Sequence, residues 1–227
     1  HSFAKKKKIK TIYDAAHTFA VKKNGKSVIS NGDLSMMSFH SAKIFNTIEG
    51  GVLYFKNIKD NNAGKLNRNF GIVGQENVLA PGINGKLNEL QAAVGIENLK
   101  EIDSEIQRRK KILSYYFEFL NKKDFMKIVT SEKNHSLQYF PVRLAGKFRS
   151  QSMRNHFFKL FKSKNIFSRK YFYPLISNFK YNKHIKSACI SRLPVSNKVS
   201  EEILCLPFHG ELTVHDIKKI TNIINNF

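Results

Sequence analysis

The sequence has 227 residues, of which 41% are hydrophobic, so it is long and apolar enough to fold into one or two globular domains. Its 39 lysines and arginines against 17 acidic residues give a net charge of +22. The basic residues occur throughout the chain without a recognisable nucleic-acid-binding module, so nucleic-acid binding is kept only as an alternative.

No apolar run approaches the roughly 20 residues of a membrane span. The two cysteines are too few for a zinc cluster and are expected to be reduced thiols. Together these features predict a soluble, cytoplasmic protein.

Three strands are predicted in the first quarter of the chain. Residues 9–13 have the pattern of a buried strand, and Asp14 follows at its carboxyl end, where open α/β sheets place their ligand crevices. Residues 34–39 predict a second strand, which leads directly to Lys43. A third strand is predicted at residues 52–55, in the same sheet, after two glycines. Two strand ends are therefore expected to converge near Asp14 and Lys43.

An aspartate at a strand end and a lysine after the next strand fit the needs of a pyridoxal-phosphate site. Such an enzyme requires a lysine that forms a Schiff base with the cofactor. It also requires a carboxylate that keeps the pyridine nitrogen protonated. Lys43 and Asp14 suit these two roles by residue type and position.

The rest of the chain predicts a second group of helices and strands. Residues 57–69 are polar enough for a short surface helix and a loop. Asn88 is expected to cap a helix with an apolar face, which residues 102–120 continue as a longer amphipathic helix. A strand at 138–143, a helix at 153–161 and a capping box at 213–216 before a terminal helix then predict a small α/β domain.

Three ordered motifs carry a resemblance to a known family. They are DAAH at residues 14–17, SFHSAK at residues 38–43 and EGG at residues 49–51. The sequence resembles the DegT/DnrJ/EryC1/StrS sugar aminotransferases, which belong to the fold-type I, aspartate aminotransferase-like pyridoxal-phosphate enzymes. Residues 69–72, 81–93 and 169–174 resemble later regions of the same family, so the resemblance covers nearly the whole chain.

The resemblance implies a role for six residues. Lys43 would bind pyridoxal 5'-phosphate as a Schiff base and carry protons. Asp14 would pair with the pyridinium nitrogen, His17 would lie beside the ring and Ser38 would bond the phosphate. Asn84 and Lys86 would reach the site of a neighbouring subunit in a homodimer, although many relatives have arginine at the position of Lys86.

Several residues of these motifs also have a structural interpretation. Asp14 is of a type that often caps a helix or forms a turn, and Ser38 can satisfy a backbone group. His17 and His40 can be structural histidines near strand ends. The paired glycines before the third strand are explained by backbone shape alone.

The resemblance also implies the organisation of the chain. Residues 1–121 would form the C-terminal part of the cofactor-binding large domain, and residues 122–227 a small C-terminal α/β domain. The phosphate-cradling turn and the ring-stacking aromatic residue of the family are not found in this sequence. We therefore expect the chain to be an N-terminally truncated part of a longer protein, which is inactive alone if the missing part is essential.

The function that the resemblance implies is transfer of an amino group, with glutamate as donor, to a nucleotide-linked 4-keto-6-deoxyhexose, expected to carry dTDP. Such products feed lipopolysaccharide O-antigen, other surface glycans and glycosylated metabolites. A 3-keto-sugar aminotransferase is the alternative within the family. A dehydratase is disfavoured because dehydratase relatives have histidine in place of the Schiff-base lysine, and this chain has Lys43.

Overall fold

The computed structural model describes residues 2–120, 125–130 and 136–227. The chain divides into two compact units, unit 1 (His1–Ser104) and unit 2 (Glu105–Phe227). This division falls inside a long helix. The domain boundary predicted between residues 121 and 122 lies outside the described residues and stays a prediction.

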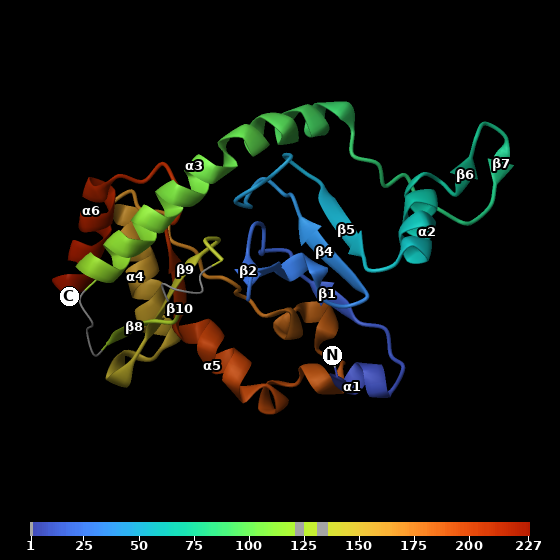
Figure 1. Cartoon of the computed structure of the whole chain (residues 1–227). Helices are drawn as coiled ribbons and strands as arrows, with labels where there is room; N and C mark the ends of the chain where they lie inside the picture. Colours follow the sequence, from blue (N-terminus) through green and yellow to red (C-terminus); the bar gives the residue numbers. More distant parts are fainter. Residues whose placement is uncertain (1, 121–124, 131–135) are drawn as a thin grey trace. The chain divides into compact units, whose positions relative to one another are not determined.

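Unit 1 is built on a three-stranded mixed sheet with the order β1-β4-β5 (Figure 1). The central strand β4 (Leu34–Ser38) pairs in parallel with β1 (Ile12–Asp14) and antiparallel with β5 (Gly51–Phe55). The predicted strands at 34–39 and 52–55 are therefore confirmed, and they share a sheet. Burial alternates along β4, as expected for a strand with one covered face.

The prediction of a buried strand at residues 9–13 is wrong in extent and in burial. The strand β1 has only three residues, and Ile12 is 71% exposed. The stretch before it is held by polar contacts instead, because the Thr11 N–H and hydroxyl both donate to Asp33 Oδ2, at 2.8 and 2.9 Å. An apolar run predicts burial only where another layer covers it, and β1 is an edge strand without such a layer within unit 1.

The remaining elements of unit 1 are short. The predicted surface helix is α2 (Ile58–Arg68), whose first turn is capped because Asn57 Oδ1 accepts the Asp60 N–H at 2.8 Å. The other elements are the helix α1 (Ser2–Lys6), the 3-10 turn Val28–Ser30, and the two hairpins formed by β2 (Lys22–Lys23) with β3 (Lys26–Ser27) and by β6 (Ile72–Val73) with β7 (Asn77–Val78).

The helix α3 (Glu89–Phe119) is a single element of 31 residues that runs from unit 1 into unit 2. The predicted cap is confirmed, since Asn88 Oδ1 accepts the Gln91 N–H at 2.9 Å. The apolar residues expected on its first turns are not buried, and Leu90 is 81% exposed. Gly95 is buried instead, and a Cβ at this glycine would lie 2.7 Å from Thr47 Cγ2. The close approach of the helix to residue 47 therefore needs a glycine.

Unit 2 packs helices against an antiparallel sheet with the order β10-β9-β8 (Figure 1). Its strands are β8 (Met126–Ile128), β9 (Phe140–Leu144) and β10 (Ile203–Leu206), and its helices after α3 are α4 (Gln151–Ser163), α5 (Pro194–Glu202) and α6 (Val214–Asn225). Short 3-10 turns lie at Gly146–Phe148, Ile176–Asn178, Lys180–Asn182, Lys186–Ala188 and Ile190–Arg192.

The small α/β domain predicted from the sequence agrees with this architecture. The predicted helix at 153–161 lies within α4, and the predicted strand at 138–143 is found slightly later, as β9. The capping box is confirmed, because Thr213 and Asp216 exchange hydrogen bonds at the start of α6. Among the described residues, no helix is both long enough and apolar enough to cross a membrane.

Candidate active site

Lys43 lies in the loop that joins β4 to β5. Ser38 and Gly51 face each other in the antiparallel register, so the loop leaves the sheet and returns to it at one point. The Phe39 N–H donates to the Gly50 carbonyl and the Thr47 N–H donates to the Phe39 carbonyl, each at 2.9 Å. These bonds close the loop where it leaves and rejoins the sheet, and they restrain the backbone that carries Lys43.

The glycine pair at the end of this loop has a structural reason. Gly50 has φ of +146°, which side-chain-bearing residues rarely adopt. A Cβ at this position would also lie 2.5 Å from Thr47 Oγ1. The EGG motif therefore serves the backbone at Gly50, as the structural interpretation predicted.

Asp14 is placed beside the same strand by the parallel pairing of β1 with β4. It stands opposite Met36, and the next residue, Ala15, donates its N–H to the Met36 carbonyl at 2.9 Å. The Asp14 Oδ1 accepts the Ala16 N–H at 3.0 Å, so the carboxylate begins a turn at the end of the strand. The turn leads to His17.

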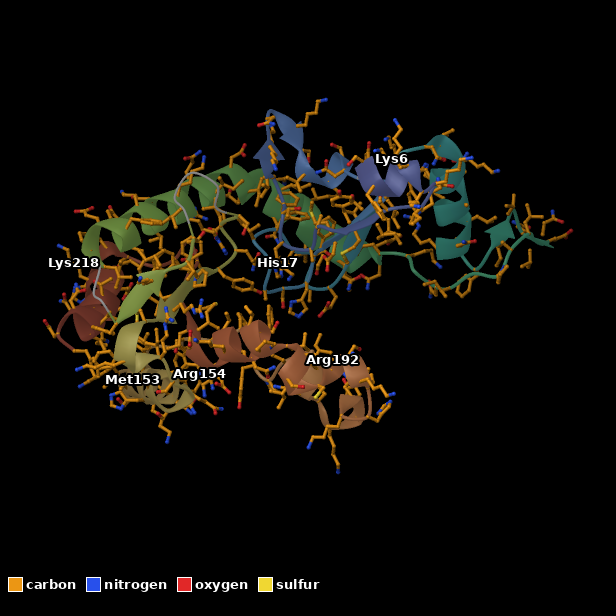
Figure 2. All side chains as sticks on the ribbon, turned by 90° about the horizontal axis from the view of Figure 1, so that it is seen from below. Lys6, His17, Met153, Arg154, Arg192 and Lys218 are labelled. Carbon is orange, nitrogen blue, oxygen red and sulfur yellow. The ribbon has the colours of Figure 1, made fainter. Side chains whose placement is uncertain are left out.

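Asp14 lies close enough to influence the pKa values of Lys43 and His17, and Lys43 lies close enough to influence that of His17. Partial burial lowers the pKa of Lys43, and the Asp14 carboxylate opposes this effect. Burial also lowers the pKa of His17, the Lys43 ammonium lowers it further, and Asp14 raises it. Figure 2 labels His17 among the side chains of unit 1. The structure thus brings together an amine, a carboxylate and an imidazole, the three groups that the sequence placed in one site.

The rings of Phe19, Phe39 and Phe45 form an aromatic cluster at this loop. The Phe39 and Phe45 rings meet edge to face with centroids 4.8 Å apart, and the Phe19 ring stacks on Phe45 at 4.5 Å. Phe45 is buried. The sequence analysis did not single out Phe19 and Phe45. The only signal for them was an aromatic residue two positions after each of the DAAH and SFHSAK motifs. Their packing anchors the Lys43 loop to the turn after Asp14.

Ser38, Asn84 and Lys86 have other contacts. Ser38 Oγ accepts the His40 N–H at 3.3 Å, which is the structural role considered for it. Lys86 Nζ donates to Asn84 Oδ1 at 2.7 Å and lies 4.4 Å from the centre of the Phe70 ring. These contacts tie Asn84 and Lys86 to each other and to the chain after α2. The described contacts do not connect them with Lys43.

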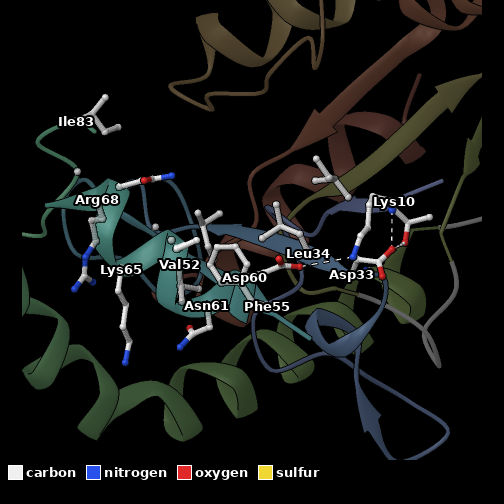
Figure 3. Close-up of a pocket in the computed structure, with 18 residues that line it drawn as sticks. Lys10, Asp33, Leu34, Val52, Phe55, Asp60, Asn61, Lys65, Arg68 and Ile83 are labelled. Atoms are coloured by element: carbon white, nitrogen blue, oxygen red, sulfur yellow. Dashed lines mark hydrogen bonds and ion pairs between the residues drawn. The ribbon is translucent and has the colours of Figure 1, made fainter. Parts of the chain in front are cut away.

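A separate hollow lies on the sheet of unit 1, against α2 (Figure 3). It has a volume of about 860 Å³ and a largely apolar lining that includes Leu34, Leu53 and Phe55. At its rim, Lys10 Nζ lies 3.8 Å from Asp60 Oδ2. Asp14, His17 and Lys43 do not line it. The hollow thus lies over the exposed face of the sheet.

Comparison with known proteins gives concordant results. The sequence profile of the DegT/DnrJ/EryC1/StrS aminotransferase family matches residues 1–225. The chain is 34% identical over 227 residues to a dTDP-4-amino-4,6-dideoxy-D-glucose transaminase of Shigella dysenteriae, a match that covers 97% of this chain and 60% of the relative. It is 36% identical over 219 residues to a protein of the same name from Escherichia coli, which covers 95% of this chain and 58% of the relative.

The fold is similar to that of an aminotransferase from Helicobacter pylori involved in the biosynthesis of pseudoaminic acid. The TM-score is 0.88 at 20% identity, over 99% of this chain and 61% of the other. This likeness confirms the predicted α/β class, the aspartate aminotransferase-like fold type I. The chain spans about 60% of the length of these relatives.

Proposed function

Because the chain belongs to the DegT/DnrJ/EryC1/StrS aminotransferase family, whose cofactor is pyridoxal phosphate, we propose that it is the lysine-bearing part of an aminotransferase. The substrate that we propose is a nucleotide-linked keto-sugar, and the amino donor an amino acid, glutamate in particular. The observation that carries this proposal is the grouping of Asp14, His17 and Lys43 at the end of β1 and in the loop after β4.

The residues present fit pyridoxal phosphate by their chemistry. Lys43 supplies an amine whose pKa is lowered by partial burial, so a larger fraction is uncharged and nucleophilic at a given pH. Asp14 supplies an exposed carboxylate at a strand end. When bound, the cofactor supplies an electron sink that lets an amino group pass between donor and acceptor.

In this proposal the side chains have different roles. Lys43 holds the cofactor and carries protons at Nζ. Asp14 would keep a proton on the cofactor's ring nitrogen, and His17, whose lowered pKa favours a neutral imidazole, would lie beside the ring. Ser38 presents its hydroxyl to the phosphate. Only Lys43 and Asp14 are chemically indispensable, because an amine and a carboxylate are the groups that the cofactor's reactions need.

The test is borohydride trapping of pyridoxal phosphate on the longest polypeptide that contains this chain, followed by peptide mapping. We expect a pyridoxyl group on Lys43. The label should vanish in Lys43→Ala and persist in Lys10→Ala, a matched exposed lysine of the same unit. Absence of label at Lys43 in the unsubstituted protein would contradict the proposal.

For the acceptor we propose a dTDP-linked 4-keto-6-deoxyhexose. The support is that both curated relatives reported above are named for a 4-amino-4,6-dideoxy-D-glucose carried on dTDP. The 3-keto isomer is the alternative. Incubation with each keto-sugar and glutamate, followed by NMR of the product, distinguishes the two, because the carbon that bears the new amine has a characteristic shift. Amination at C3 alone would contradict the proposal.

We also propose that the protein works as a homodimer with shared sites. The support is that Asn84 and Lys86 lie in an exposed segment and do not contact Lys43 in the described structure. The test mixes Lys43→Ala protein with Lys86→Ala protein, each impaired alone, under conditions of subunit exchange. Random reassortment should restore about one quarter of the unsubstituted activity, since half of the dimers then hold one intact site. No recovery would contradict site sharing.

The place of this activity in the cell is part of the proposal. Cys189 and Cys205 are both free thiols, which suits a reducing compartment, and we propose the cytoplasm. The amino sugar would supply surface glycans such as the O-antigen of lipopolysaccharide. Deletion of the gene should then remove the amino sugar from the surface polysaccharide, and an unchanged sugar composition would contradict this role.

A further inference from the structure

The imidazole ring of His40 lies between the two ends of the Lys43 loop. Its Nδ1 accepts the Ala42 N–H at 3.1 Å, and its Nε2 lies 3.5 Å from Glu49 Oε1. Ala42 directly precedes Lys43, whereas Glu49 stands at the far end of the loop, where the chain returns to β5. One side chain therefore contacts both the turn that presents Lys43 and the end that closes the loop.

The backbone strengthens both connections. The Lys43 N–H donates to the His40 carbonyl at 2.9 Å, so the residue with the ring also holds the lysine's own backbone. At the other end, the Glu49 N–H donates to the Thr47 carbonyl at 2.8 Å, and Thr47 Oγ1 donates to the Glu49 carbonyl at 2.6 Å. Displacement of the His40 ring would therefore disturb the start of the Lys43 side chain.

The contacts also fix the form of the imidazole. Since Nδ1 accepts a hydrogen bond, it carries no proton, and the proton of a neutral ring lies on Nε2, which faces Glu49. The ring thus accepts a hydrogen bond at Nδ1 and directs its Nε2 toward Glu49 Oε1. Asparagine at this position can replace only the acceptor of the Ala42 N–H. Glutamine can only place an N–H group near Glu49.

We propose that His40 and Glu49 are positioning residues, which hold the loop in the shape that presents Lys43 to the cofactor. This inference rests on the proposed role of Lys43. The pair is half exposed, with side-chain exposure of 50% for His40 and 63% for Glu49, and an exposed polar contact of this kind contributes little to global stability. Its effect is therefore local order around Lys43, rather than stability of unit 1.

The test compares His40→Ala, His40→Asn, His40→Gln and Glu49→Gln with the control His184→Ala, which removes an exposed histidine of unit 2. The first readout is hydrogen exchange of the cofactor-free protein, followed at the Ala42 and Lys43 amides. The second is the rate at which pyridoxal phosphate becomes attached at Lys43. Both are measured on the longest polypeptide that contains this chain.

We expect His40→Ala to speed exchange at the Ala42 and Lys43 amides about tenfold or more, with the β4 amides unchanged. Attachment of pyridoxal phosphate should slow by about tenfold. Each of His40→Asn and His40→Gln should give an intermediate loss, and Glu49→Gln the smallest, because its side chain still offers an oxygen. The control should match the unsubstituted protein.

Two outcomes separate this inference from the proposed function. If His40→Ala leaves both the local exchange and the attachment rate unchanged, or speeds exchange equally along β4, the positioning role is wrong. If the unsubstituted protein takes no cofactor at Lys43, the proposed function fails. The exchange measurement then still decides whether His40 and Glu49 order the loop.

Discussion

The two units hold their chains together by different means. Unit 2 has fully buried aromatic side chains, such as Tyr116, Phe140 and Phe157, packed between helices and an antiparallel sheet. In unit 1 the buried apolar residues among those described are Ala15, Met37, Ile44 and Phe45, while the outer strands expose apolar side chains such as Leu53 at 54%. The candidate site is therefore carried by the unit with the smaller core, and hydrogen bonds in its loops fix its shape.

The largest expected effect is the loss of a core ring in unit 2. Phe157 is fully buried, and its ring lies 4.8 Å from that of Phe227 and 5.9 Å from that of Phe125. Phe157→Ala should lower the free energy of unfolding by roughly 3–5 kcal/mol, because it removes apolar contacts and leaves a cavity. Urea unfolding measures this loss. The matched control is Phe3→Ala in unit 1, where the ring is exposed and the loss should be near zero. Equal losses of stability in the two variants would contradict the difference between the two units.

Acid should weaken a partly buried ion-pair network in unit 2. Burial raises the pKa of Glu105, but hydrogen bonds from Arg109 and Arg108 and from the Gly210 N–H outweigh this and hold the pKa below its usual value. The Arg109 Nε to Glu105 Oε1 distance is 2.6 Å. Because the folded pKa is the lower one, this stabilisation is present above the unfolded value of about 4.5 and is lost as the pH falls through the folded pKa.

The variant that tests this network is Glu105→Gln. It should lower the free energy of unfolding at neutral pH by roughly 1–3 kcal/mol. It should also flatten the fall in stability below the unfolded pKa. The control is Glu97→Gln, whose partner Lys100 forms an exposed pair. If the two variants have the same acid profile, the Glu105 network does not account for the acid sensitivity.

Two helix caps test whether equal local changes have unequal consequences in the two units. Thr213 caps α6, which buries four residues, and Asn57 caps α2, which buries none. Thr213→Ala should reduce global stability by about 1 kcal/mol. Asn57→Ala should fray α2 without moving the main unfolding transition. Hydrogen exchange of both helices, measured together with urea unfolding, distinguishes the global effect from the local one. An equal loss of global stability in both variants would contradict this prediction.

The smallest expected effect is a change of charge within the site. Asp14→Asn should lower the pKa of His17, because the carboxylate raises it, and Lys43→Met should raise that pKa, because the ammonium lowers it. NMR titration of the His17 ring measures both directions. The exposed His184 serves as the control ring in the same spectra. Shifts of the same sign in both variants would show that Asp14 and Lys43 do not act on His17 as the structure indicates.

Much of the local structure follows from short segments of sequence. The caps at Asn88 and Thr213 were predicted from a polar residue that precedes an apolar pattern, and each bond spans only three residues. The strands before and after Lys43 were predicted from their apolar runs, and the backbone role of Gly50 from the conformational freedom of glycine. The burial of residues 9–13 was predicted wrongly, because burial depends on what covers a strand.

The sequence by itself determined the order of the motifs, the candidate lysine and the ends of several helices, because these depend on residues a few positions apart. Only the tertiary structure decided that Asp14 acts electrostatically on Lys43, that both act on His17, and that His40 faces Glu49. These interactions depend on the parallel register of β1 with β4 and on the antiparallel register of β4 with β5. A register is set by pairing and burial across the whole sheet, and a shift of β1 by one residue would turn the Asp14 side chain to the opposite face.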